Sequence, residues 1–194
     1  MPGPIPALPD LLRRALAARS PLRVDEPGRR LAAVAVVVVP GPDSVLLIRR
    51  AERLGDPWSG QVGLPGGGFD PGDVDLLRTA VRETFEEVGV DLGAAECVGT
   101  LDDVAPRTPV LPPVTVRPFV FCLPRRPPLT LSQEIAHAFW TELEHLRRPG
   151  VRVARSLDIL GIPRTIEGYA VGDDFVWGMT ERILTPFLEL APPS

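Results

Sequence analysis

The chain has 194 residues, of which 44% are hydrophobic and 24% charged, so it is long enough for one well-filled globular domain and is not disordered. Its net charge of -4 argues against a protein that coats nucleic acid, which is normally basic. All 21 basic residues are arginine, and the lack of lysine excludes a P-loop phosphate site and Schiff-base chemistry. The amino terminus lacks the pattern of a secretory signal, and the longest apolar run, Leu31–Val39, is too short to span a membrane. We therefore expect a cytoplasmic protein with no membrane or nucleic-acid partner.

Hydrophobic periodicity predicts a chain that mixes strands and helices. In chain order, the expected elements are a helix at Leu8–Ala18, strands at Leu31–Val39 and Ser44–Arg50, a helix at Asp73–Val88, strands at Cys97–Val104 and Val114–Leu123, a short strand or turn at Ile135–Trp140, a helical turn or two at Glu142–Arg147, a late hairpin at Val151–Ala154 and Ile162–Val171, and a helix at Phe175–Leu190. Pro40-Gly41-Pro42 is expected to join the first two strands into a hairpin. Pro186 predicts a kink or an early stop in the last helix. The pattern predicts an α/β sandwich on a mixed sheet, with residues 1–28 as an N-terminal helix and loop packed on a domain of residues 29–194.

The predicted helix Asp73–Val88 carries three carboxylates close together. At about 100° per residue, Glu83, Glu86 and Glu87 fall on one face of this helix. An apolar stripe is expected on the opposite face, at Leu77, Val81, Phe85 and Val88. Gly89, which follows the last turn, is typical of a helix C-terminus.

These carboxylates point to a divalent cation. Like charges this close repel one another, and one carboxylate would keep a proton unless a cation lies among them. Oxygen ligands suit Mg²⁺ or Mn²⁺, which leave coordination positions for water and phosphate oxygens. The preceding Gly66-Gly67-Gly68 lets the backbone approach closely, so that a carbonyl joins the metal or amides face a phosphate. The simpler interpretation is a solvated acidic helix face, but it gives no reason for the glycine-rich turn or for Arg82, at ion-pair spacing from Glu86.

A family pattern matches these residues. The run Arg82-Glu83-Thr84-Phe85-Glu86-Glu87-Val88-Gly89-Val90, preceded by Pro65-Gly66-Gly67, resembles the Nudix box. The resemblance implies an α/β/α sandwich that hydrolyses a nucleoside diphosphate linked to another group, with Mg²⁺ or Mn²⁺ as cofactor. It further implies that Glu86, Glu87 and the backbone carbonyl of Gly66 bind the metal. Glu83 would be a further ligand or a proton acceptor, and Arg82 would orient the acids.

The start of the box is one residue longer than the general family pattern. Counted back from Arg82, the position of the family's glutamate holds Val74, and counted forward from Gly67 it holds Asp73. Asp73, which follows Pro71-Gly72, is also a natural helix N-cap, so its role stays open. The longer start resembles the coenzyme A diphosphatase branch, as do three other segments: Leu46–Ala51, Gly60–Pro65 and Trp177–Arg182. This branch implies that coenzyme A or acyl-CoA is cleaved to 3′,5′-ADP and 4′-phosphopantetheine.

Other substrates and roles stay open beside this one. Within the family, ADP-ribose, NADH, dinucleoside polyphosphates and oxidised nucleotides are alternatives, and a non-catalytic ligand sensor of the same fold is another, although sensors often lose the box acids present here. In every enzymatic case the partner is a small nucleoside diphosphate derivative. Many relatives dimerise, so a homodimer is one option.

Further site residues are suggested by position. Glu134 precedes an apolar run, and in several Nudix enzymes such a loop glutamate assists as a base or an extra ligand; an exposed loop glutamate is the alternative. Arg49 and Arg50, with the backbone of Gly67 and Gly68, are the candidate substrate-binding groups, because guanidinium and amide groups bind phosphate. Surface arginines at a strand end are the simpler interpretation of the first two.

Overall fold

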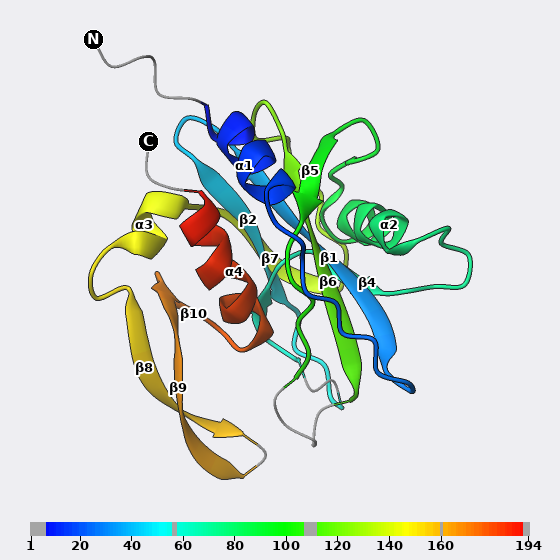
Figure 1. The fold of residues 1–194 in the computed structure, drawn as a ribbon. Coiled ribbons are helices and arrows are strands. Elements are labelled where there is room, and N and C mark those ends of the chain that lie inside the picture. Colours follow the sequence, from blue (N-terminus) through cyan, green and yellow to red (C-terminus); the bar gives the residue numbers. More distant parts are fainter. Residues whose placement is uncertain (1–6, 56–57, 107–111, 160, 192–194) are drawn as a thin grey trace.

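The computed structural model describes residues 7–55, 58–106, 112–159 and 161–191, which form four helices and ten strands (Figure 1). The helices are α1 (Leu8–Ala17), α2 (Leu76–Val88), α3 (Leu143–Arg147) and α4 (Met179–Leu190). The strands are β1 (Arg30–Val39), β2 (Ser44–Arg50), β3 (Val62–Gly63), β4 (Gly66–Gly68), β5 (Glu96–Thr100), β6 (Val114–Cys122), β7 (Ile135–Glu142), β8 (Arg152–Ile159), β9 (Ile162–Val171) and β10 (Asp174–Trp177). Within these ranges, no helix is long and apolar enough to cross a membrane.

The larger of the two described sheets is mixed. Its order is β3-β2-β1-β6-β5, with β4 also paired to β1 and β7 to β2. β1 and β6 run parallel from the pair Arg30 and Val114 to the pair Val38 and Cys122, whereas the other neighbours are antiparallel. β1 lies in the middle of this sheet and is covered on both faces, which explains its nearly continuous run of valine and alanine.

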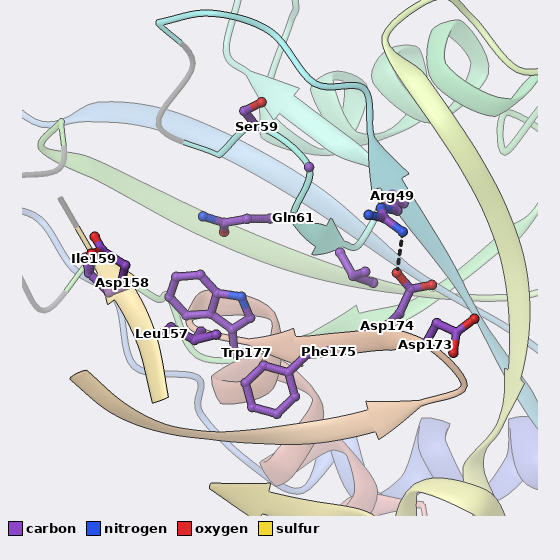
Figure 2. A pocket seen from close by; sticks show the side chains of 12 residues that line it. Arg49, Ser59, Gln61, Leu157, Asp158, Ile159, Asp173, Asp174, Phe175 and Trp177 are labelled. Atoms are coloured by element: carbon purple, nitrogen blue, oxygen red, sulfur yellow. Dashed lines mark hydrogen bonds and ion pairs between the residues drawn. The ribbon is translucent and has the colours of Figure 1, made fainter. Parts of the chain in front are cut away.

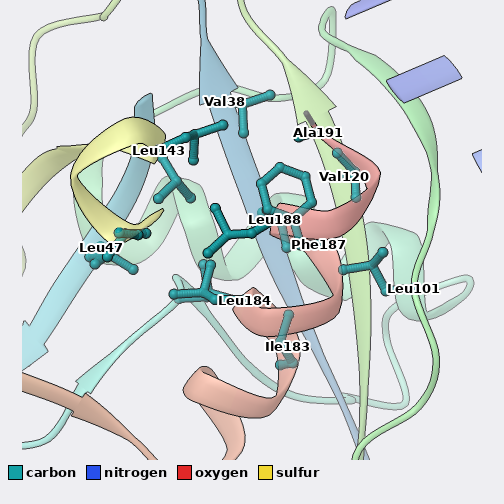
Figure 3. Close-up of a cluster of buried hydrophobic side chains, with 14 of the residues drawn as sticks. Val38, Leu47, Leu101, Val120, Leu143, Ile183, Leu184, Phe187, Leu188 and Ala191 are labelled. Atoms are coloured by element: carbon teal, nitrogen blue, oxygen red, sulfur yellow. The ribbon is translucent and has the colours of Figure 1, made fainter. Parts of the chain in front are cut away.

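Helices cover both faces of this sheet, α2 on one side and α1 with α4 on the other (Figure 1). Alternate residues of β1 serve the two layers: Val36 and Val38 belong to the cluster under α4, and Ala35 and Val37 to the cluster under α2. Figure 3 shows the first cluster, in which Phe187 and its neighbours on α4 lie over the sheet. The predicted α/β/α sandwich with a central mixed sheet is confirmed.

The first helix belongs to the layer of α4. Its apolar side chains Leu8, Leu12 and Leu16 are buried in the same cluster as Leu188. The helix forms as predicted, one residue shorter. The division into residues 1–28 and 29–194 stays a prediction.

Strands β1 and β2 separate along most of their length, and the glycine turn Gly66-Gly67-Gly68 (the box turn) lies between them. β1 and β2 pair only near the Pro40-Gly41-Pro42 turn, at Val38 with Val45 and Val39 with Ser44. Beyond that point β2 pairs with β3, at Ile48 with Gly63 and Arg49 with Val62, and β1 pairs with β4, from Ala32 with Gly68 to Val34 with Gly66. The segment that precedes the acidic helix is therefore fixed to the backbone of the central strand.

A second sheet of three antiparallel strands, in the order β10-β9-β8, lies at the carboxyl-terminal side of the chain (Figure 1). The predicted late hairpin is confirmed, but β8 extends to Ile159. The helix predicted from Phe175 was wrong over its first part: Phe175, Val176 and Trp177 form β10, because aromatic and β-branched residues favour strands and Gly178, with φ of 68°, ends the strand. Pro186 lies inside α4 and does not end it.

Candidate active site

Helix α2 packs on the sheet with three residues of the predicted apolar stripe, Leu77, Val81 and Val88, but not with the fourth, Phe85. Its buried residues are Thr79, Ala80, Thr84, Glu87 and Val88. Phe85, by contrast, is 57% exposed. Small side chains let α2 approach the sheet closely, and one acid is enclosed with them. The predicted apolar stripe was therefore wrong at Phe85, and Glu87 lies on the packed face of the helix.

The ends of α2 are set by Asp75 and Gly89. The side chain of Asp75 accepts a hydrogen bond from the N–H of Arg78 at 2.8 Å, so Asp75 is the N-cap and the helix begins at Leu76. Asp73 as the N-cap was wrong. Gly89 adopts a left-handed φ of 71° at the other end, as predicted.

The glycine turn brings the backbone into contact with two of the three acids. Gly66 has φ of 150°, and a β-carbon there would lie 2.2 Å from the carbonyl oxygen of Ala33. Its N–H donates a hydrogen bond to Glu87 at 2.9 Å. A β-carbon on Gly67 would lie 2.4 Å from Cδ of Glu83. Only glycine fits both positions. Because neither residue has a side chain, the backbone of Gly66 and Gly67 can lie in contact with Glu83 and Glu87.

Arg82 is the hydrogen-bonding centre of the cluster. Its Nε and Nη2 each donate to Asp73 at 3.0 Å. Its Nη1 donates to Glu83 at 2.8 Å and to Glu86 at 3.1 Å. Nη2 also reaches the carbonyl oxygen of Gly68 at 3.2 Å. One guanidinium thus ties the box turn, the segment before α2 and two box acids together, an arrangement that suits the orienting role predicted for it.

Glu87 is the most enclosed acid of the cluster, with 4% of its surface exposed. Burial raises its pKa to about 7. The hydrogen bond from Gly66 and the charge of Arg50 oppose this rise, and the like charges of Glu83 and Glu134 add to it. The nearest oxygen–nitrogen distance between Glu87 and Arg50 is 3.8 Å, which is long for an ion pair. Glu87 is therefore a carboxylate whose negative charge is only partly compensated.

Asp73 and Glu83 share Arg82 unequally. Hydrogen bonds from Arg82 hold the pKa of Asp73 well below its usual range. Burial raises the pKa of Glu83 even though Arg82 also donates to it. The positive charge of Arg82 thus stabilises Asp73 first, and Glu83 receives the smaller share.

The two predicted substrate-binding arginines reach different parts of the molecule. Arg50 approaches Glu87 on α2, as described above, whereas Arg49 lies 3.3 Å from Asp174 on β10. The structure therefore brings Arg50 to the acidic cluster and places Arg49 beside the second sheet.

Glu134 lies at the margin of the cluster and is held there by the loop after β2. Its carbonyl oxygen accepts a hydrogen bond from the N–H of Ala51 at 2.8 Å, and its carboxylate pairs with Arg53 at 2.9 Å. The negative charge of Glu134 helps to raise the pKa of Glu87. No local sequence signal reveals this pairing, because Arg53 and Glu134 lie 81 residues apart in the chain.

The carboxylate oxygens of the cluster are ligands that suit a hard divalent cation, although in this structure they do not converge on a single position. In the described part of the chain, no three Asp, Glu, His or Cys side chains are arranged to hold a metal ion. Glu83 and Glu86 instead accept hydrogen bonds from Arg82. The described charges nevertheless favour a cation, because five carboxylates face three guanidinium groups. They are Asp73, Glu83, Glu86, Glu87 and Glu134 against Arg50, Arg53 and Arg82.

A pocket of about 300 Å³ lies between the larger sheet and the second sheet (Figure 2). One wall consists of Arg49 and the segment 59–62, and the other comes from the ends of β8 and β10. Figure 2 shows the rings of Trp177 and Phe175 on the second wall, Gln61 across from them, and the ion pair between Arg49 and Asp174 to one side. Sequence reasoning does not place Trp177 at this pocket, because its segment is predicted as helix.

With this fold and cluster established, comparison with known proteins identifies the class. Residues 29–158 match the NUDIX domain family. The chain belongs to the Nudix family, and it is a Nudix pyrophosphohydrolase of nucleoside diphosphate derivatives. Hydrolases of this family generally use divalent metal ions. A MutT/nudix family protein from Enterococcus faecalis has the same fold, with a TM-score of 0.56 and 20% identity over 92% of this chain and 67% of that chain.

Among curated proteins, the chain resembles the coenzyme A diphosphatase branch. It is 30% identical to the mitochondrial coenzyme A diphosphatase NUDT8 of Mus musculus over 189 residues, which cover 93% of this chain and 87% of that protein. It is 40% identical to the uncharacterized protein C14C4.10c of Schizosaccharomyces pombe over 119 residues, or 59% of this chain. That match spans 36% of the length of the yeast protein.

Proposed function

We propose that the chain hydrolyses the diphosphate of coenzyme A or an acyl-CoA with Mg²⁺ or Mn²⁺, giving 3′,5′-ADP and 4′-phosphopantetheine. The reaction type rests on one observation above all, the placement of Glu83 and Glu87 against the Gly66-Gly67 backbone within a Nudix fold. Coenzyme A as the substrate is supported by the 30% identity to the mouse coenzyme A diphosphatase over 93% of this chain. The segments that resemble this branch, Gly60–Pro65 among them, add to that support.

The metal would be held by oxygen atoms of Glu83, Glu86, Glu87 and the carbonyl of Gly66. When bound, the ion supplies positive charge to the phosphate oxygens and lowers the pKa of a bound water. A bound ion would compete with Arg82 for Glu83 and Glu86. Asp73 would hold Arg82 in place, because its two oxygens accept hydrogen bonds from Nε and Nη2.

The remaining groups of the site divide between the substrate and the proton. Arg50 and the amides of Gly67 and Gly68 bind phosphate oxygens. Glu134, held by Arg53, accepts the proton of the attacking water. The oxygen of that water bonds to one phosphorus, the bond from this phosphorus to the bridging oxygen breaks, and the bridging oxygen leaves on the other phosphate.

The test compares Glu86→Gln with Glu144→Gln. Glu86→Gln keeps the size of the side chain and removes its charge, so turnover should fall by about 100-fold or more, as it does when a metal site loses an important group. Glu144 is an exposed acid on α3 and serves as the matched control, for which turnover should stay at the wild-type level. Mn²⁺ affinity measured by calorimetry should fall in Glu86→Gln alone.

The substrate is tested with a panel of coenzyme A, ADP-ribose, NADH, a dinucleoside polyphosphate and an 8-oxo nucleotide. Coenzyme A should have the highest kcat/KM. A higher kcat/KM for another compound of the panel would contradict coenzyme A as the substrate but not the proposed metal site. Unchanged turnover of every diphosphate by Glu86→Gln at saturating Mg²⁺ would contradict the mechanism itself.

A further inference from the structure

The pocket between the two sheets has the wrong charge for a phosphate group. Its described charged residues are Arg49 and three aspartates, Asp158, Asp173 and Asp174. Arg49 already lies 3.3 Å from Asp174, so the lining carries an excess of negative charge. An anionic group that entered this pocket would be repelled. The pocket is therefore suited to an uncharged part of a ligand.

The rest of the lining is apolar and aromatic. Leu157 comes from β8, and Phe175 and Trp177 come from β10 (Figure 2). The guanidinium of Arg155 lies 4.7 Å from the ring centroid of Phe175, so this ring is held by a cation–π contact. Aromatic walls with a few carboxylate acceptors bind an uncharged chain that carries N–H and O–H donors.

A short stretch of backbone joins this pocket to the acidic cluster. Val62 lines the pocket, and Gly66, four residues later, donates its N–H to Glu87. Four residues span at most about 14 Å. The carbonyl oxygen of Gln61, another lining residue, accepts a hydrogen bond from the N–H of Arg50 at 3.1 Å. A substrate whose diphosphate lies against Gly66 is thus within reach of the pocket with one of its arms.

We propose that this pocket binds the pantetheine arm of coenzyme A, an assignment that rests on the proposed function. The arm is uncharged, and it offers a hydroxyl and two amide N–H groups to the carboxylates and an aliphatic chain to Leu157 and Trp177. The nucleotide half is excluded from the pocket, because its ribose carries a 3′-phosphate that the aspartates repel. The nucleotide half therefore binds outside this pocket.

The experiment combines a blocking variant with a shortened substrate. Leu157→Trp fills the pocket, and Ile162→Trp places the same ring on the exposed end of the same hairpin, where Ile162 is 52% exposed and does not line the pocket. The shortened substrate is the methyl ester of 3′-phosphoadenosine 5′-diphosphate, which keeps the nucleotide and the diphosphate and lacks the arm. Leu157→Trp should lower kcat/KM for coenzyme A at least tenfold and leave that for the methyl ester within twofold. Ile162→Trp should change neither.

A binding measurement separates the arm from catalysis. Equilibrium dialysis of pantetheine, which has no phosphate, should show binding to the metal-free wild type and to Ile162→Trp, and weaker binding to Leu157→Trp. Asp173→Trp, on the exposed turn before β10 that also lines the pocket, gives the same comparison if circular dichroism shows that Leu157→Trp does not fold. Parallel loss of both substrates, or equal pantetheine binding in the blocked and control variants, overturns the pocket assignment. Failure of the wild type to cleave coenzyme A overturns the proposed function instead.

Discussion

Gly67→Ala should inactivate the enzyme with little effect on its fold. The added β-carbon would lie 2.4 Å from Cδ of Glu83 and 2.5 and 2.6 Å from its two oxygens. Carbon atoms in contact lie about 3.5–4.0 Å apart, so the carboxylate must move by about 1 Å. A displacement of this size at a catalytic group costs about 100-fold in rate. That corresponds to about 2.7 kcal/mol of transition-state free energy.

The thermal stability of the same variant should change little, because the group that must move is the end of a flexible side chain. An off-rotamer side chain costs about 0.5–1.5 kcal/mol. For a chain of this size each kcal/mol lowers Tm by about 2–4 °C. The assay is kcat on coenzyme A at saturating Mg²⁺ beside a thermal melt. Activity within threefold of the wild type would refute the idea that the position of Glu83 limits the reaction.

The neighbouring glycines supply the matched controls. In Gly66→Ala the β-carbon meets the backbone of β1, 2.2 Å from the oxygen of Ala33 and 2.6 Å from Cα of Val34, and φ of 150° adds strain. Since backbone cannot turn away, Tm should fall by roughly 10 °C, equivalent to about 3 kcal/mol or more. A β-carbon on Gly68 would meet nothing within 4 Å, so Gly68→Ala should have the smallest effect of the three on both kcat and Tm.

Two further predictions concern stability. Burial alone would raise the pKa of Asp103, but hydrogen bonds from Arg117 at 2.9 Å and from the N–H of Val24, together with the positive charges of Arg117 and Arg23, outweigh burial, and the pKa is lowered. The stabilisation is therefore present above the unfolded pKa of about 3.9 and is lost as pH falls through the folded value. Asp103→Asn should cost about 2–3 kcal/mol in urea denaturation at neutral pH. This deficit should shrink at about pH 3, and a deficit that is the same at both pH values would contradict the reasoning. Pro186→Ala should raise Tm by several degrees, because a proline inside a helix costs about 3 kcal/mol; an unchanged or lower Tm would show that the surrounding core compensates.

The parts of the fold that depend on local sequence were predictable. Pro40-Gly41-Pro42 between two apolar runs indicates the β1–β2 hairpin, and Gly89 marks the end of α2, because turn residues act on their immediate neighbours. The cluster of box acids was visible for the same reason, since all of them lie within two turns of one helix. The metal ligands, the catalytic roles and the homodimer stay predictions.

What escaped prediction depends on contacts between distant segments. Leu77, Val81 and Val88 of α2 face inward as predicted, but Phe85 is exposed and Glu87 is buried, because contacts with β1 and β4 decide the edges of the packed face. Asp73 lies in the loop before α2 and pairs with Arg82 on the helix. From the sequence, Asp73 could equally cap the helix or form an ion pair, and the local pattern does not decide between the two. The pocket wall that carries Trp177 depends on the pairing of β10 with β9. The sequence around Trp177 has a helical hydrophobic period, so it predicts a helix there and not a strand.

The attachment of Gly66 to the central strand has an evolutionary consequence. The glycine turn that contacts Glu83 and Glu87 also shares hydrogen bonds and steric contacts with the central strand of the larger sheet, so a mutation there should change folding and bond cleavage at once. The described strands of the second sheet pair with one another and not with the larger sheet, and they form one wall of the pocket. Selection can therefore exchange side chains on β8 and β10 to accept a new leaving group while the hydrolytic chemistry is inherited intact. In a directed-evolution experiment, variants with altered substrate range should gather in these two strands.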